Sequence, residues 1–423
     1  MKHRYILMAL IAGGAALSAS ASAVQVSIVC GAVGQELTLC KEEAEAWATK
    51  TGNTVRVLDT VNSTTDRLAY YQQNLSAGNS DIDVYQVDVV YPGLLKNYLL
   101  DLTPYLTKAQ TSQYFPSIYE NNVLNGKVLA LPWFTDGGVL YYRKDLLAKY
   151  GYKAAPKTWQ EMATMAKKIQ DGEQKAGNKN FYGYVFQGKA YEGLTCDALE
   201  WINSFKGGTI IDSKGTITIN NPNAIAALDF FAKQVKQISP PAVLTYDEEG
   251  ARAVWQSGNA AFMRNWPYAY ALSDAKDSPI AGKFGVSALP KGGTTGQSSA
   301  TQGGWGLAVS KFSKHPKEAA SLVSYLTGPE VQKERAIKGS YNPTIPSLYK
   351  DQDVLKATPI FGSLYDVFTG AVARPATVTG AKYNQVSSMF WTAVYNTLSG
   401  NGSAKDNLAN LDNQLKGLKG SGW

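Results

Sequence analysis

The chain has 423 residues, of which 44% are hydrophobic and 18% are charged, and its formal net charge is +7. This length exceeds what one hydrophobic core usually supports, so we expect two domains. The basic residues are scattered along the chain, whereas nucleic-acid-binding proteins usually gather them on one face. The composition therefore argues against a nucleic-acid partner.

The first 23 residues have the pattern of a secretory signal peptide. Lys2 and Arg4 precede an apolar run that ends at Leu17, and residues 21–23 match an A-x-A cleavage site. A membrane anchor is the alternative, but the run is shorter than the roughly 20 apolar residues that span a bilayer. We therefore expect cleavage after Ala23 and a soluble, periplasmic protein.

The three cysteines are compatible with export. Cys30 and Cys40 are close in sequence, and an oxidising compartment would permit a disulfide between them. Geometry rather than spacing decides whether two sulfur atoms can meet, so the sequence leaves this disulfide open. Cys196 lies in a segment that is apolar on one face, which predicts a buried free thiol.

Short apolar strands alternate with amphipathic helices in the first part of the chain. The pattern predicts strands over 24–29, 54–58 and 82–87, with helices over 36–49 and 66–75 between them. Such alternation indicates an α/β lobe with a largely parallel sheet.

A second α/β stretch begins near Trp133. A strand then returns over 306–310, and the helix after it, 316–326, ends at a Gly-Pro pair. No long linker interrupts the chain, so several short crossings should join the lobes as a hinge, a device for capturing ligands. The elements predicted in the second stretch cover 158–170, 182–186, 193–205, 224–237 and 247–257.

Histidine is nearly absent, which excludes most hydrolytic chemistry. Beyond the signal peptide only His315 remains, just before Pro316 at a predicted helix start. Ser-His-Asp catalysis needs a histidine held by a carboxylate, and zinc sites usually need several His or Cys ligands. No zincin, nucleophile-elbow, phosphate-loop or dinucleotide motif is present. We predict no catalytic residue, metal or cofactor, although glycoside hydrolysis needs only two carboxylates and stays open.

Aromatic residues provide the positive signal, with 25 Tyr and 9 Trp. Their rings join a flat apolar body to a polar group, and this combination matches the apolar faces and hydroxyl rim of a sugar. Four segments, 132–138, 265–268, 303–306 and 373–375, combine such rings with a carboxylate, close backbone or an arginine. Their candidate residues are Phe134, Asp136, Trp266, Tyr268, Gly304, Trp305 and Arg374.

Polar candidates in the first lobe follow predicted strands, where open α/β sheets bind ligands. Glu36 follows a glycine-containing loop, Asn62 and Arg67 follow the second strand, and Asp88 follows the third. A carboxylate at the end of a buried strand is costly unless it has partners, so Asp88 is the strongest candidate. A helix-capping or turn role for Asp88 is the alternative.

The segments that hold these candidate residues, taken in chain order, resemble those of the extracellular solute-binding proteins of carbohydrate ABC importers. These form the maltose-binding-protein superfamily, and within it the chain most resembles trehalose/maltose-binding proteins. The resemblance covers nearly the whole chain, and its most specific motif is 258–268. It is carried by 31–36, 132–136, 187–193, 258–268, 303–305 and 374–375.

The resemblance implies the two-lobed periplasmic-binding-protein fold, of the α/β class, with a ligand cleft at the hinge and three crossings between lobes. We expect 24–131 with 306–343 to form the N-terminal lobe and 132–305 with 344–423 to form the C-terminal lobe. Phe134 stands where a tyrosine is also natural in this family. The resemblance further implies that sugar hydroxyls bond to Glu36, Arg67, Asp88, Asp136, the Gly304 main chain and Arg374, while the rings stack on Trp266, Tyr268 and Trp305.

The expected function is therefore that of the periplasmic substrate-binding component of an ABC sugar importer. The ligand would be a disaccharide such as trehalose or maltose, with sucrose or a related glucoside as alternatives, and the partners would be the transmembrane transporter subunits. We expect a monomer that is not an enzyme. A secreted glycosidase or transglycosidase, or the same fold binding a different polyol, are the competing interpretations.

Overall fold

The structure is a computed structural model that describes residues 23–423. The predicted signal peptide, 1–23, lies outside the described residues except for Ala23, so its cleavage stays a prediction. Within the described range no helix is both long and apolar enough to cross a membrane.

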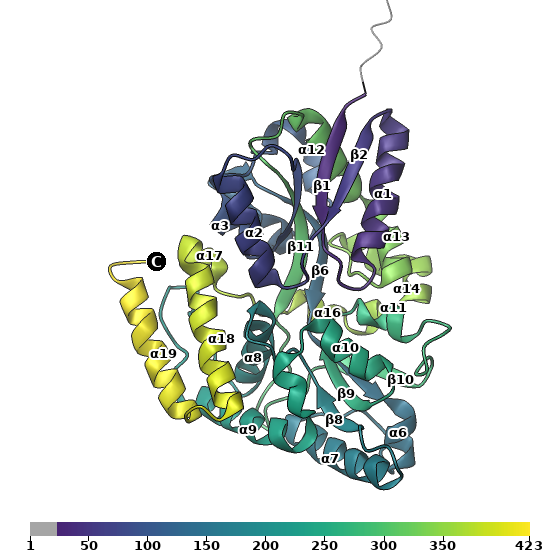
Figure 1. Cartoon of the computed structure of the whole chain (residues 1–423), viewed down its shortest axis with the longest axis vertical. Coiled ribbons are helices and arrows are strands. Elements are labelled where there is room, and N and C mark those ends of the chain that lie inside the picture. The colour runs from purple at the N-terminus through teal and green to yellow at the C-terminus, as the bar shows by residue number, and fades with distance from the viewer. Residues whose placement is uncertain (1–22) are drawn as a thin grey trace, which may run out of the picture.

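Five strands form the sheet of the first lobe, in the upper half of Figure 1, in the order β2-β1-β3-β11-β6. β1 runs parallel to β2 and β3, whereas β11 runs antiparallel to β3 and β6. Because β11 enters this lobe from the second lobe and β6 leaves it, the sheet is mixed rather than largely parallel as predicted. The strands are β1 (Gln25–Cys30), β2 (Thr54–Asp59), β3 (Val84–Asp88), β6 (Leu131–Gly137) and β11 (Gln302–Val309).

The helices of the first lobe begin and end at residues suited to those places. Ser63 caps α2 through a bond from the Asp66 amide at 3.3 Å, and α12 and α13 begin at Pro316 and Pro329. The main helices are α1 (Glu36–Thr51), α2 (Thr64–Ser76), α12 (Pro316–Leu326) and α13 (Pro329–Gly339). Between β3 and β6 lie α3 (Tyr91–Leu95), η1 (Thr103–Tyr105), α4 (Lys108–Thr111), α5 (Pro116–Glu120), β4 (Val123–Leu124) and β5 (Lys127–Val128).

The second lobe contains a four-stranded sheet in the order β10-β7-β9-β8, with α18 and α19 packed beside α8 and α9 (Figure 1). Its strands are β7 (Val139–Arg143), β8 (Tyr182–Val185), β9 (Ala260–Asn265) and β10 (Phe284–Ala288). Its helices are α6 (Lys144–Lys149), α7 (Trp159–Lys175), α8 (Glu192–Ser204), α9 (Pro222–Ile238), η2 (Pro241–Thr245), α10 (Glu248–Gln256), α11 (Ala269–Ser273), α18 (Tyr383–Ser399) and α19 (Ala404–Lys419).

The chain passes between the two sheets from β6 to β7, from β10 to β11, and again in the segment between α13 and α18. At the first crossing Gly138 is required, because a β-carbon there would lie 2.0 Å from the Glu200 carboxylate. The lobe division expected at 131/132, 305/306 and 343/344 stays a prediction. The third crossing contains η3 (Pro346–Lys350), α14 (Gln352–Ala357), α15 (Ile360–Ser363), α16 (Tyr365–Thr369), α17 (Ala376–Thr379) and η4 (Gly380–Lys382).

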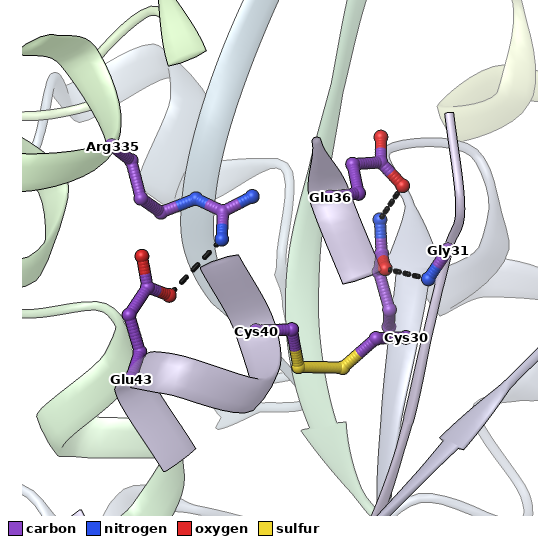
Figure 2. The surroundings of a disulfide bond; sticks show 7 residues. Cys30, Gly31, Glu36, Cys40, Glu43 and Arg335 are labelled. Carbon is purple, nitrogen blue, oxygen red and sulfur yellow. Dashed lines mark hydrogen bonds and ion pairs between the residues drawn. A yellow bond between two sulfur atoms is a disulfide. The ribbon is translucent and has the colours of Figure 1, made fainter. Parts of the chain in front are cut away.

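A disulfide joins Cys30, at the end of β1, to Cys40 in α1, and Figure 2 shows its surroundings. This resolves the alternative that the sequence left open, and Cys196 is buried and free as predicted. The loop between the two bonded cysteines is held further by Gln86, which accepts a bond from the Gly31 amide at 2.5 Å and donates one to Glu36 at 3.3 Å. The first turn of α1 is thereby fixed to the sheet.

A buried ion pair links α1 to α13 on the other side of this helix. Arg335 donates to Glu43 at 3.0 Å (Figure 2), and its guanidinium lies 3.8 Å from the centre of the Trp133 ring. Burial raises the pKa of Glu43 to about 7, and the Arg335 charge opposes that rise. The pair therefore holds α1, α13 and β6 together behind the cleft.

Reduction of the disulfide should lower the free energy of unfolding by roughly 2–3 kcal/mol, because it releases the loop closure that the bond imposes on the unfolded chain. Urea unfolding of the same protein with and without a thiol reductant measures this difference. A Cys30→Ala/Cys40→Ala variant serves as the control and should not respond to reductant. Equal stabilities of the oxidised and reduced wild type would contradict the expectation.

Candidate ligand-binding site

A cavity with an empty volume of about 560 Å³, part of it open to solvent, lies where the two lobes meet. Of the residues predicted for the site, all except Arg67 line it: Glu36, Asn62, Asp88, Phe134, Asp136, Trp266, Tyr268, Gly304, Trp305 and Arg374. The fold thus brings together side chains that are far apart in sequence, while their part in binding stays a prediction.

Arg67 lies behind the cavity wall rather than in it. Its Nε and Nη2 donate to the Val61 carbonyl at 3.2 and 3.1 Å. Its guanidinium lies 4.2 Å from the centre of the Trp305 ring, a cation–π contact. Arg67 therefore supports Trp305 from behind, and the direct sugar contact that the resemblance implied stays a prediction.

One end of the cavity, which we call the arginine end, is formed by Arg374, Asp88 and Glu192. Arg374 donates from Nη2 to Asp88 at 2.8 Å and from Nη1 to Glu192 at 2.7 Å. Its side chain is 2% exposed, so both ion pairs are removed from water. Arg374 therefore ties the end of β3 in the first lobe to the start of α8 in the second.

Glu192 was not nominated from the sequence, although it lies in the segment 187–193 that carried part of the resemblance. Its carboxylate also accepts bonds from the Tyr383 hydroxyl and from Ser387 Oγ, both on α18. Its backbone amide donates to Thr65 Oγ1 in α2 at 3.2 Å, a further contact between the lobes. Glu192 is thus saturated by protein and fixes Arg374 rather than presenting a free carboxylate.

The opposite end, which we call the tyrosine end, is formed by Tyr341, Tyr268 and the loop 33–35. The Tyr341 hydroxyl donates to the Val33 carbonyl at 3.0 Å and accepts from the Gln35 amide at 3.1 Å. The Tyr341 ring stacks on Tyr268 with centroids 6.5 Å apart and lies 5.0 Å from Phe134. No sequence signal nominated Tyr341, because its role depends on a loop some 300 positions away in the chain.

Trp266 forms an aromatic part of the cavity wall. Its ring lies over the guanidinium of Arg264, 3.9 Å away, and its indole N–H donates to Glu248 at 3.4 Å. Arg264 is fully buried, with Asp197 at 2.9 Å and Glu200 at 2.5 Å. Because a β-carbon on Gly303 would lie 3.0 Å from the Trp266 ring, glycine lets the ring approach the backbone of β11. The sequence placed this glycine segment before the strand, but β11 begins at Gln302 and includes it.

Three carboxylates, those of Glu36, Asp136 and Glu248, face the cavity without an ion-pair partner of their own. Burial raises the pKa of each. For Asp136 the rise in pKa is large, and the neighbouring charges of Glu36 and Asp88 add to it, while the charge of Arg264 opposes it. Glu36 accepts a bond from Gln86, and Glu248 accepts bonds from Tyr191 and Trp266. Among the residues that the structure describes, Asp136 has no such donor, and a ligand hydroxyl would offer it one.

No cluster of metal-binding side chains occurs in the part of the chain that the structure describes. The polar groups of the cavity are arranged to accept and donate hydrogen bonds. Together with the rings of Trp266, Trp305 and Tyr268, they match the chemistry of an uncharged, hydroxyl-rich ligand.

Replacing Asp136 by Asn should stabilise the unliganded protein at pH 7 by roughly 1–3 kcal/mol, because an unpaired buried charge disappears. An acid whose folded-state pKa is raised contributes stability below its unfolded pKa of about 3.9 and loses it as pH rises through the folded value. The gap between Asp136→Asn and wild type should therefore shrink as pH falls from 7 to 4. Urea unfolding at both pH values measures it, and Asp229→Asn, on the exposed face of α9, should show no such gap.

Comparison with known proteins places the chain in a family. The sequence profile of the bacterial extracellular solute-binding proteins matches residues 36–333. A protein of Deinococcus radiodurans named as a probable ABC transporter-binding protein is 58% identical over 408 residues, which cover 96% of this chain and 97% of that protein.

Solved structures agree with the sequence comparison. Maltose-bound MalE3 of T. maritima superposes with a TM-score of 0.88 at 39% identity, covering 94% of this chain and 100% of that one. A solute-binding protein of Thermotoga lettingae solved with α-D-tagatose shares the fold, with a TM-score of 0.82 at 23% identity over 94% of this chain and all of that one. The chain therefore belongs to the bacterial extracellular solute-binding protein family and has its two-lobed fold.

Proposed function

We propose that this protein is the exported substrate-binding component of an ABC sugar importer and that it binds one disaccharide between its lobes. Maltose and trehalose are the first candidates, with sucrose or a related glucoside next. The protein acts as a monomer and delivers the sugar to the transmembrane subunits of the transporter.

The observation that carries this proposal is the combination of aromatic rings and unpaired carboxylates in one cavity. Trp266 and Trp305 offer flat faces to the apolar sides of sugar rings, while Glu36 and Asp136 accept bonds from hydroxyl groups. A phosphate or carboxylate ligand would meet these acids and be repelled, since Arg374 is already paired with two carboxylates. The charge pattern therefore favours a neutral sugar.

The closed ends of the cavity support a short sugar. Protein contacts close it at the tyrosine end, through Tyr341 and Val33, and at the arginine end, through Arg374 and Asp88. The T. maritima relative at 39% identity was solved with maltose, which has two rings. Both points favour a disaccharide over a long oligosaccharide.

Because both lobes supply residues to the cavity, ligand binding is coupled to the movement of the lobes toward each other. Asp88 and Glu36 belong to the first lobe, whereas Glu248 and Trp266 belong to the second. A ligand that contacts all four binds better when the lobes are together, so it shifts the population toward that state by its difference in affinity. The transporter could thus distinguish loaded from empty protein.

Two features support export to the periplasm. The first 23 residues have the pattern of a cleaved signal peptide, and Cys30 and Cys40 form a disulfide of the kind that persists in oxidising compartments.

Isothermal titration of the purified mature protein tests the proposal directly. Maltose, trehalose, sucrose, glucose, mannitol and glycerol phosphate would be titrated in turn, and each mixture would be assayed for hydrolysis. We expect saturable one-to-one binding of at least one disaccharide without cleavage. Binding of mannitol alone would assign the site to another polyol, and turnover would identify a glycosidase instead.

Replacing Trp266 by Ala should weaken binding of that disaccharide about tenfold or more, because the sugar loses its stacking surface. The melting temperature should change little, since Trp266 is only partly buried and lies on the cavity wall. Tyr105→Ala, which removes an exposed aromatic residue outside the cavity, is the matched control and should bind normally. An unchanged dissociation constant for Trp266→Ala would remove this residue from the site.

A further inference from the structure

Tyr341 closes the tyrosine end of the cavity as part of a connected wall. Its side chain is 2% exposed and is packed between Phe134 and Tyr268. Its hydroxyl bonds to the loop at two points, the Val33 carbonyl and the Gln35 amide. The ring and the loop therefore cannot move independently.

The loop side of this wall leaves no gap beside Tyr268. Gly34 has a φ of +61°, and a β-carbon built on it would lie 2.5 Å from the Tyr268 ring. The backbone of the loop in the first lobe is thus pressed against an aromatic ring of the second lobe. The Tyr268 hydroxyl is held in turn by Glu249 at 2.7 Å, so this ring is also fixed.

The two ends of the cavity differ in how firmly they are closed. At the arginine end, Arg374 is held by buried ion pairs with Asp88 and Glu192, and breaking such pairs is strongly unfavourable. At the tyrosine end, the Tyr341 side chain lies beside Tyr268 and is held to the loop by two neutral hydrogen bonds, each worth about 1 kcal/mol. A ligand too long for the cavity would meet Tyr341 there, and this block can be removed without breaking a buried ion pair.

We propose that Tyr341 sets the length of saccharide that the site accepts, admitting two sugar rings and excluding a third. This inference rests on the proposed function, because it assumes that a sugar occupies the cavity. Tyr341 would exclude a longer saccharide sterically. The carboxylates and aromatic rings of the cavity have a separate role, which is to attract the disaccharide.

The test compares each disaccharide with a trisaccharide that extends it. The pairs are maltose with maltotriose, trehalose with its 4-O-α-glucosyl derivative, and sucrose with raffinose, and calorimetry uses the pair whose disaccharide the wild type binds. The quantity measured is the ratio of the trisaccharide dissociation constant to the disaccharide dissociation constant.

In Tyr341→Ala this ratio should fall about tenfold or more, because the steric block at the end of the cavity is gone. In Tyr341→Phe, which keeps the ring but frees the loop, it should fall about threefold through the lost hydrogen bonds. Tyr349→Phe is the matched control: its hydroxyl donates to the Pro343 carbonyl at 2.9 Å in the same chain segment but does not line the cavity. Its ratio should equal that of the wild type.

Circular dichroism melting would establish that each variant is folded, and if Tyr341→Ala is not, Tyr341→Phe decides. A wild type that binds the trisaccharide as tightly as the disaccharide would overturn the inference. So would an unchanged ratio in the folded Tyr341 variants. A wild type that binds none of the disaccharides would refute the proposed function instead, so the two failures are distinguishable.

Discussion

The pairing of Arg374 with Asp88 and Glu192 is the constraint on which the arrangement of the lobes depends. One guanidinium, removed from water, joins carboxylates that lie in different lobes. Burying three charges is costly, and removing one partner from such a group leaves an uncompensated charge, which typically costs 3–5 kcal/mol. The three groups are therefore favourable only when they meet, and they meet only when the lobes are together.

The three other acids of the cavity differ from Asp88 and Glu192 because they are not paired with an arginine. Glu36, Asp136 and Glu248 have no ion-pair partner of their own, and burial raises their pKa. Glu36 is held by Gln86, and Glu248 by Tyr191 and Trp266, so Asp136 is the one of the three that lacks a hydrogen-bond donor among the described residues. A hydroxyl of the proposed sugar would supply that donor. Aromatic rings held by buried arginines, Trp266 by Arg264 and Trp305 by Arg67, give the ligand surfaces that are fixed in advance.

Sequence patterns predicted β1 to β3 and several of the longer helices, but not β6, β7, β10, α13, α18 or α19. They also nominated most of the residues that line the cavity, because strand ends and Gly-aromatic segments carry local signals. They missed Tyr341 and Glu192, whose roles come from contacts with residues 33–35 and with α18 that no local pattern encodes. They nominated Arg67 as a site residue, but its place behind Trp305, outside the cavity lining, depends on side-chain packing that the sequence does not reveal. They also predicted a largely parallel sheet, because the direction of β11 is decided by the crossing between lobes.

The most direct test of whether both lobes build one site is a double-mutant cycle on Asp88→Asn and Glu192→Gln. The quantity measured is the affinity of each variant for the disaccharide, by calorimetry. Because both carboxylates pair with Arg374, we expect the double variant to lose less affinity than the two single losses combined, with a coupling of roughly 0.5–3 kcal/mol. Strictly additive losses would mean that the two lobes contribute independently. That result would contradict a cleft completed by the arginine between them.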